Sequence, residues 1–423
     1  MPRFPVALSL AALALAGTAR AAGYAINDQG SRAMAFGLAT SAALDGPETL
    51  FYNPAGAIQL GKGWHLSVGG AQILADFSST PVETGTQTFK SSRTHFEVPH
   101  LYVARRFAGR FSVGGSVNAP YGLATEWPLD FPGRFLSRIA DLKTVQAAAL
   151  VGVALPRGWG VGLGPTWTTG DVRLFRNVDL DIFQPGAQAD ADLTGSGHAL
   201  GWRLGVRWTG KSGWRFGFSA RGDTNLTFRG KVDYTPPVFG SASLDRAVQN
   251  LFQDGPAGTT LTLPATLTVG VGRVHAKWTW GADLWWTHWS VLDKVIIDLE
   301  PIEVGGQSLV VEEFTVNNWR DVSSLRLGVK RQVGAHWSWS TGAYLDSSPV
   351  PRETADPLLP DSDRTSVTGG VTLWRGRFSL DLAAQLVVFD SLDTAGTSNS
   401  FPSAYDAAVK AISATCAWTW GGK

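Results

Sequence analysis

Apolar residues alternate with polar or small residues along most of the chain after residue 62. Between Trp202 and Trp208, apolar side chains occupy every second position, and Arg203, Gly205 and Arg207 occupy the others. A period of two places these two sets on opposite faces of a β-strand. About fourteen segments of this kind follow one another. They lie near residues 63–77, 95–107, 110–119, 143–155, 158–175, 197–210, 213–229, 262–274, 275–290, 321–333, 335–346, 364–376, 377–390 and 407–420.

The gaps between these segments fall into two length classes. Leu155–Gly158 and Thr209–Ser212 have the length of hairpin turns, whereas 120–142, 230–261 and 291–320 are long. Short turns at one end, long loops at the other and an even number of strands are typical of outer-membrane β-barrels. The pattern predicts an all-β fold, an antiparallel transmembrane barrel. A large soluble β-sandwich is the alternative, and the lack of a repeat of fixed length disfavours a propeller.

The composition favours strands that face lipid. Only 17% of the 423 residues are charged, against about 25% in soluble domains. Trp64, Trp159, Trp208 and Trp420 lie at or near segment ends, where an indole ring suits the boundary between water and lipid. The net charge of +1 provides no basic excess for nucleic-acid binding. A single cysteine, Cys416, excludes an intrachain disulfide, and we expect it to face lipid.

Residues 1–21 have the pattern of a signal peptide. Arg3 supplies a positive charge, residues 6–17 are apolar or small apart from Ser9, and Ala19-Arg20-Ala21 fits the A-x-A cleavage pattern. The apolar run is too short to span a membrane. We therefore expect the chain to be exported and the mature protein to begin at Ala22.

Residues 22–62 do not alternate, and they precede the first predicted strand. They are rich in glycine, contain the turn signal Asn53-Pro54 and carry apolar residues such as Phe36 and Leu50. A barrel with this many strands has a lumen wide enough to hold a folded segment. We predict that residues 22–62 fold into the lumen as a plug, or hatch, and that residues 63–423 form the barrel. A disordered periplasmic tail is the alternative, but the apolar content argues against free solvation.

Several short motifs occur in the order in which a known family carries them. They are Ala22–Tyr24, Phe51–Gly56, Ala119–Trp127, Leu263–Thr266, Trp286–Ser290, Trp319–Asp321, Asp346–Pro351 and Leu359–Arg364. On these motifs the chain resembles the FadL/TodX family of outer-membrane transporters for long-chain fatty acids and other hydrophobic compounds, from about residue 22 to residue 390. It departs from the family at its end, because Gly421-Gly422-Lys423 follow Trp420, where the family usually ends in an aromatic residue.

The resemblance implies a 14-stranded antiparallel β-barrel in the outer membrane of a Gram-negative cell, with an N-terminal hatch and a kinked third strand that makes a lateral opening. It implies a diffusion channel for hydrophobic molecules, either fatty acids or aromatic hydrocarbons. We expect the hatch, with Asn53 and Pro54, to gate an apolar pocket that releases ligand sideways. The expected partners are these small molecules and outer-membrane lipids, and we expect a monomer.

Candidate ligand contacts come from two regions. Tyr24 and Ile26 resemble the ligand-contacting end of the family, and their alternative role is packing against the barrel wall. A fatty acid would also need a cation that faces the lumen. Arg173, Arg176 and Lys294, near extracellular strand ends, are candidates, although pairing with neighbouring aspartates is the common alternative.

The third strand carries the candidate for the lateral opening. Gly114 and Gly115 lie in its interior and Pro120 lies at its end. Glycine inside a strand often marks a bulge or kink, and proline removes a hydrogen-bond donor from the ladder. The two glycines could instead permit close packing against the plug.

We expect no enzyme, metal site or cofactor. His288 and Ser290 could form a nucleophile pair, but they lie in a motif that resembles a transporter. The seven histidines show no metal-ligand spacing, and the glycines of 160–164 precede no predicted helix, which argues against a phosphate loop. A general porin or a structural or adhesive barrel are the alternative functions. A porin would have a charge-dense lumen without a plug, and an adhesin would carry a large external domain.

Overall fold

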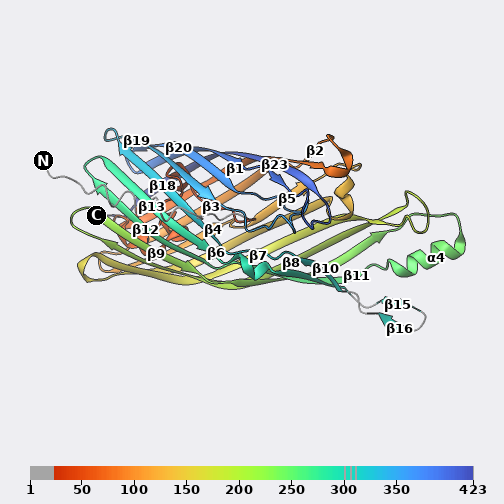
Figure 1. Cartoon of the computed structure of the whole chain (residues 1–423). Coiled ribbons are helices and arrows are strands. Elements are labelled where there is room, and N and C mark those ends of the chain that lie inside the picture. The colour runs from red at the N-terminus through yellow and green to blue at the C-terminus, as the bar shows by residue number, and fades with distance from the viewer. Residues whose placement is uncertain (1–22, 300–301, 305–306, 310–311, 423) are drawn as a thin grey trace.

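The computed structural model describes residues 23–299, 302–304, 307–309 and 312–422. These residues form a closed antiparallel β-barrel of fourteen strands, as predicted. The barrel closes where the first strand pairs with the last, from Trp64 opposite Trp420 to Pro81 opposite Ser403. Figure 1 shows the barrel from the side. The predicted signal peptide, residues 1–21, lies outside the described residues.

Some wall strands are continuous and others consist of two segments in line. The continuous strands are β1 (Gly63–Pro81), β3 (His95–Arg106), β6 (Ile139–Ala154), β7 (Trp159–Asp179), β8 (Gln188–Thr209), β19 (Trp337–Asp346), β20 (Arg364–Arg375), β21 (Phe378–Phe389) and β23 (Ser403–Trp420). The two-segment strands are β4 (Phe111–Asn118) with β5 (Gly122–Glu126), β9 (Trp214–Arg221) with β10 (Thr224–Thr235), β11 (Gly255–Leu263) with β12 (Thr266–His275), β13 (Trp278–Thr287) with β14 (Lys294–Leu299), and β17 (Glu312–Val316) with β18 (Val322–Gln332).

The two ends of the barrel differ in the length of their connections. Short turns lie at the end where β23 terminates, and one of them contains η4 (Pro156–Gly158). The opposite end carries the longer loops, with α4 (Ala242–Leu251) and the hairpin of β15 (Ile302–Val304) and β16 (Gln307–Leu309) farthest from the barrel (Figure 1). The shorter elements of these loops are η2 (Val82–Thr84), β2 (Phe89–Lys90), η3 (Pro132–Phe135) and β22 (Leu392–Asp393), whereas η5 (Trp289–Leu292) lies between β13 and β14.

The three long gaps predicted as loops contain further strand. β5 lies in 120–142, the end of β10 with α4 and β11 lies in 230–261, and β14 to β17 lie in 291–320. The prediction was wrong here because the strands continue beyond the apolar belt. There the outward side chains are polar, as Arg173 and Lys231 show, so the apolar period of two disappears although the ladder persists.

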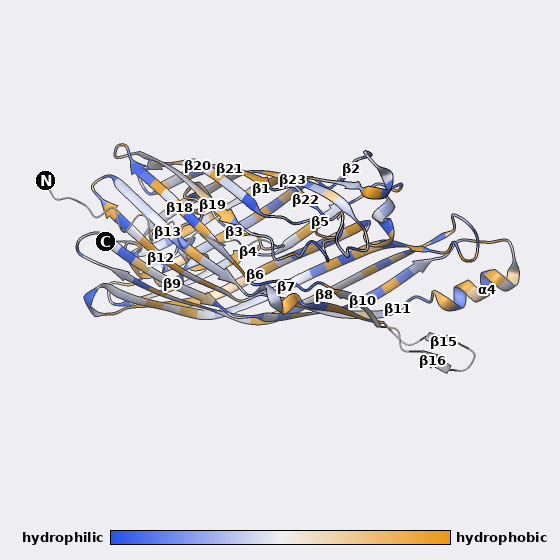
Figure 2. Ribbon diagram, viewed as in Figure 1, coloured by the Kyte–Doolittle hydropathy of each residue, from blue (hydrophilic) through white to orange (hydrophobic). Residues whose placement is uncertain are grey.

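Between this polar part of the strands and the short-turn end, the outer surface of the barrel is apolar. Outward side chains such as Leu163, Val151 and Val367 are more than half or about half exposed, and Figure 2 shows apolar residues recurring along the strands. Tryptophans gather near the short-turn end, where Trp64 stacks on Trp420 with ring centroids 6.0 Å apart. No helix in the described ranges is long and apolar enough to cross a membrane.

Residues 23–62, called the lumenal segment below, lie inside the barrel (Figure 1). They form α2 (Ser31–Ala35), α3 (Thr49–Tyr52) and η1 (Pro54–Gln59). α2 contacts β1, β19, β20, β21 and β23, whereas η1 contacts β3, β4, β6, β7 and β8. Because these two sets of strands form different parts of the wall, the segment extends across the lumen.

Polar contacts attach the lumenal segment to the wall. Arg32 pairs with Asp381 of β21 at 2.8 Å. Ser41 donates two hydrogen bonds to the carboxylate of Asp283 on β13, from its N–H and its hydroxyl, each 2.8 Å long. Charged or hydroxyl groups buried with such partners avoid the cost of an unpaired polar group. The segment is therefore a packed part of the structure.

Gly114 of β4 provides space for the lumenal segment. A Cβ atom at this position would lie 2.7 Å from a methyl group of Leu50, which is 1% exposed. Gly115 faces the other side of the wall, and a Cβ there would lie 3.3 Å from the carbonyl oxygen of Ala148. The interpretation that glycine permits close packing against the segment therefore describes Gly114.

We expect Gly114→Val to destabilise the protein by about 1–3 kcal/mol, because its methyl groups would displace a buried leucine. Gly115→Val serves as the matched control. Its side chain would face the lipid, and valine is a favourable residue in β-strands. The midpoint of thermal unfolding measures both. Equal midpoints for the two variants would contradict the close-packing role of Gly114.

Candidate functional site

The hydrogen-bonded wall is interrupted at the third strand. β4 pairs with β3 up to Val117 opposite Leu101, and β5 then pairs with β6 alone. In the described part of the chain, the β3 residues from His95 to His100 pair with β1 on one side and with no strand on the other. The interruption, residues 119–121, contains Pro120, which has no N–H to donate.

The start of the lumenal segment satisfies the backbone groups at the interruption. The N–H of Ile26 donates to the carbonyl of Pro120 at 2.8 Å, and the N–H of Gly122 donates to the carbonyl of Tyr24 at 3.0 Å. Ala25 and Tyr121 thus form an antiparallel bridge. Pro120 lies at the interruption, whereas Gly114 and Gly115 lie in the regular, paired part of the strand. A lateral opening at Pro120 stays a prediction.

A cavity of about 340 Å³ adjoins the interruption. Its inner lining comes from neighbouring strands and includes Ile73 of β1, Val98 of β3 and Val387 of β21. At the interruption it is also lined by Pro99 and Val145, two exposed residues of the outer face. The cavity therefore adjoins both the inside of the barrel and its lipid-facing surface.

Tyr24 and Ile26 both line this cavity, and their contact with a ligand stays a prediction. Tyr24 is buried against Trp289, Tyr121 and Trp319, with ring centroids 4.9, 5.9 and 6.0 Å away. Packing against the barrel therefore accounts for one side of the Tyr24 ring. Ile26 is half-buried.

Asp361, in the loop between β19 and β20, holds the start of the segment in place. Its carboxylate accepts the N–H of Gly23 and the hydroxyl of Ser348, each at 3.0 Å. Burial raises the pKa of Asp361 to about 6, although the Arg364 guanidinium lowers it in part. The loop thus attaches the start of the lumenal segment, which lines the cavity, to the barrel.

The inner end of the cavity is polar. Asp28, Tyr344, Gln385, Asp361 and Arg364 line it. Burial raises the pKa of Asp28 to about 6, against the opposing effect of Arg326 and Arg364.

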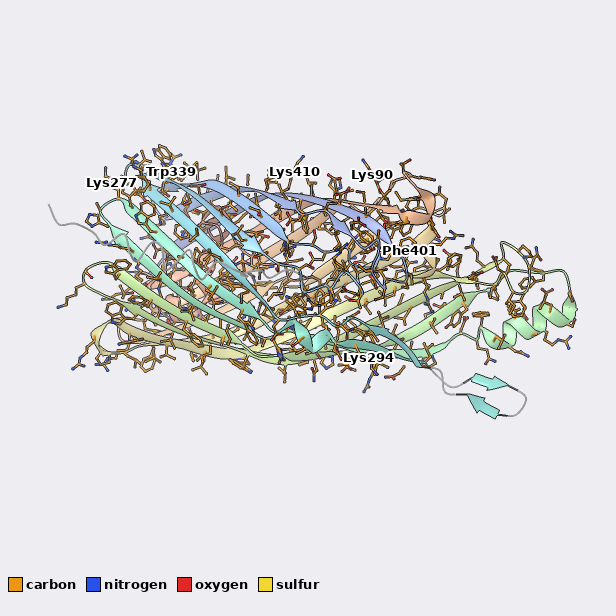
Figure 3. The ribbon with its side chains drawn as sticks, in the orientation of Figure 1. Lys90, Lys277, Lys294, Trp339, Phe401 and Lys410 are labelled. Atoms are coloured by element: carbon orange, nitrogen blue, oxygen red, sulfur yellow. The ribbon has the colours of Figure 1, made fainter. Side chains whose placement is uncertain are left out.

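The three predicted cations lie elsewhere. Arg173 lies on the outer face of β7, where its guanidinium makes two hydrogen bonds to Asp192, at 2.9 and 2.7 Å. Lys294 is exposed at the start of β14 and points away from the wall in Figure 3. Neither residue, nor Arg176 of β7, is among the described residues that line the cavity. A ligand contact by any of them stays a prediction.

Asn53 and Pro54 lie at the junction of α3 and η1 in the lumenal segment. The Asn53 side chain accepts the N–H of Ala55 at 3.1 Å. Its amide donates to the carbonyls of Ser41 at 2.8 Å and Val206 at 3.1 Å. One buried side chain therefore joins two turns of the segment to β8.

Sequence reasoning missed Asp28, Tyr344 and Gln385 as cavity residues. Tyr344 and Gln385 occupy ordinary strand positions without a motif, and only the pairing of β19 to β21 places them beside Asp28. Arg364 is the last residue of the motif Leu359–Arg364, and this motif could have indicated Arg364 as a cavity residue. Among the described residues, no group of three or more His, Cys, Asp or Glu could hold a metal ion.

We expect Asp361→Ala to loosen the start of the lumenal segment, because Gly23 loses its acceptor. Amide exchange at Ile26 and Gly122 should then accelerate by about tenfold, the effect of one lost hydrogen bond to a charged group. Hydrogen exchange by mass spectrometry measures both sites. Asp361→Asn keeps an acceptor oxygen and should show a smaller change. Unchanged exchange in the alanine variant would contradict this role.

Comparisons with known proteins identify the family and agree with the fold. A family model described as outer membrane protein transport protein (OMPP1/FadL/TodX) matches residues 12–420. The long-chain fatty acid transport protein of Escherichia coli (strain K12) is 25% identical over 311 residues, and the match covers 65% of this chain and 66% of that protein. The chain thus spans slightly less than two thirds of the length of this relative.

Solved structures share the fold. The structure of a Pseudomonas aeruginosa FadL homologue has a TM-score of 0.79 at 16% identity and covers 95% of this chain and 100% of its own. The P. putida toluene transporter TodX has a TM-score of 0.74 at 12% identity, with 96% and 100% covered. The family consists of outer-membrane transport proteins and not of enzymes, and the protein is a transmembrane barrel of the outer membrane. The chain therefore belongs to the FadL/TodX family.

Proposed function

We propose that this protein is a diffusion channel that carries hydrophobic molecules across the outer membrane, with the lumenal segment as its gate and the interruption as its exit. The observation that carries the proposal is the cavity, which adjoins both the inner and the outer face of the wall at one interrupted strand. Relatives and structural neighbours are named as transporters of long-chain fatty acids and of toluene. Both classes fit an apolar cavity.

The cavity supplies the driving force for capture. Each buried CH₂ group contributes about 0.8 kcal/mol, so a chain of about ten such groups could gain roughly 8 kcal/mol before the cost of ordering it. Phe77, Phe96, Leu123 and Val409 provide such surface in the lining. A water-filled porin would offer no comparable gain.

The lumenal segment supports a gated channel over a general porin. α2 and η1 contact strands in different parts of the wall, so the segment occupies space in the lumen that a porin would leave open. Its first residues also line the cavity and close the backbone at the interruption. Movement of the segment would therefore change the cavity and the exit together.

Release through the wall avoids water. A hydrophobic molecule that left towards the periplasm would lose the transfer free energy gained in the cavity. A gap between β3 and β5 offers a path into the bilayer, because no strand of the wall pairs across it in the described residues. The hydrogen bonds of the lumenal segment to Pro120 and Gly122 close this gap, so the segment has to move for the path to open.

We expect Val145→Trp to reduce uptake of hydrophobic compounds by about three- to tenfold, because the indole would narrow the outer mouth of the cavity. Val151 is the matched control, since it is also an outward valine of β6, 50% exposed against 49% for Val145, and does not line the cavity. Uptake of radiolabelled laurate, dodecanol and toluene by whole cells is the measurement. Normal uptake in an assembled Val145→Trp variant, or an equal loss in Val151→Trp, would exclude this exit.

The gate is tested by replacing Asn53 and Pro54 with alanine. The double variant loses three hydrogen bonds of Asn53 and the fixed backbone angle of proline. We expect a folded barrel with raised leakage of small solutes, measured as conductance in planar bilayers. Lys62→Ala, at an exposed position of the same segment, is the control. Wild-type conductance together with wild-type uptake in the double variant would indicate an inert plug.

A further inference from the structure

The charges around the inner end of the cavity do not balance. Arg326 pairs with Asp346 at 3.2 Å, and Arg364 lies 3.6 Å from Asp346 and 4.0 Å from Asp361. Asp28 is the third carboxylate of this group, and it lies within electrostatic reach of both arginines. Three carboxylates thus share two guanidinium groups, and both guanidinium groups already pair with Asp346 or Asp361.

Asp28 is left without a partner. Neither of its carboxylate oxygens receives a hydrogen bond or forms an ion pair within 4.0 Å in the part of the chain that the structure describes, and Oδ1 is sealed from solvent. Asp28 lines the cavity. A carboxylate removed from water without a donor is costly, and the raised pKa of Asp28 reflects this burial.

A second acceptor lies at the same end of the cavity. The Oε1 atom of Gln385 is buried and receives no hydrogen bond from the described residues, whereas its Nε2 donates to the hydroxyl of Tyr344. Gln385 and Tyr344 both line the cavity with Asp28. The inner end therefore presents two unused acceptors next to a surplus of one negative charge.

The outer end of the cavity carries no such surplus. Arg93 and Lys143 lie there with Asp141 and Glu97. Lys143 lies 2.9 Å and Arg93 3.6 Å from the Asp141 carboxylate. Two cations and two carboxylates balance, so the preference for a ligand's polar group is set at the inner end.

We propose that the cavity selects hydrophobic molecules whose polar end donates a hydrogen bond and carries no negative charge, and that Asp28 determines this selectivity. A long-chain alcohol or a protonated long-chain amine has this chemistry. Its O–H or N–H donates to Asp28, and an ammonium group has further hydrogens for Gln385. A fatty-acid carboxylate would instead add a second unpaired negative charge. This inference rests on the proposed function.

Competition binding with three ligands of equal chain length tests the inference. Dodecanol, dodecylammonium and laurate compete with radiolabelled dodecanol for the purified full-length protein in a non-ionic detergent at pH 8, where the amine is protonated and the free fatty acid ionised. We expect dodecanol and dodecylammonium to compete at concentrations at least tenfold lower than laurate. Comparison of the first two shows whether the hydroxyl or the cation is preferred.

Two variants locate the selectivity. Asp28→Asn removes the negative charge with little change in shape, and we expect it to bring laurate within about threefold of dodecanol and to weaken dodecylammonium about tenfold. Asp171→Asn removes a charge from an exposed position on the outer face of β7 and should leave the order of affinities unchanged. Native thermal stability in both variants confirms folding.

The outcomes separate this inference from the proposed function. Binding of all three ligands with laurate equal to or tighter than dodecanol would overturn the inference and leave the channel function standing. An unchanged order of affinities in Asp28→Asn would overturn the role of Asp28. Failure of all three compounds to bind would contradict the proposed function and the inference with it.

Discussion

Backbone hydrogen bonding is the constraint on which the rest of this structure depends. In lipid, each unpaired N–H or C=O group costs several kcal/mol, so a sheet can span a membrane only when it closes on itself. The pairing of β1 with β23 completes that closure. Strand pairing is interrupted between β3 and β5. There the lumenal segment hydrogen-bonds to Pro120 and Gly122 in place of a neighbouring strand.

The first residues of the lumenal segment therefore have three structural roles: they pair with the interrupted strand, line the cavity and attach the segment to the barrel. Tyr24 and Ile26 contribute backbone groups to the interrupted strand and side chains to the cavity, and the adjacent Gly23 is attached to Asp361. A segment that must move to open a path would therefore also expose backbone groups at the interruption. In the proposed mechanism, the energetic cost of that exposure would keep the site closed until a ligand contributed compensating contacts.

The polar lining distinguishes this cavity from a simple apolar pocket. Names of relatives suggest both fatty acids and aromatic hydrocarbons, and the apolar lining accommodates either. The unpaired carboxylate of Asp28 opposes an anionic ligand, whereas a neutral hydrocarbon would leave it unsatisfied. Under the proposed selectivity, a few buried polar atoms would discriminate between ligands more strongly than apolar surface does, because an unmet hydrogen bond is costly.

Local signals, the period of two and the family motifs, were enough to predict the barrel and its strands in the apolar belt. The same signals led us to predict that the N-terminal segment is distinct from the barrel strands. They also singled out Tyr24 and Pro120, whose roles at a ligand site and an opening stay predictions. The face of the wall that Arg173 occupies could not be read from the sequence, since a shift of one residue in a strand reverses its side chains. The surroundings of Asp28 could not be read from the sequence either. Tyr344 and Gln385 come close to Asp28 only because the barrel closes around the lumenal segment.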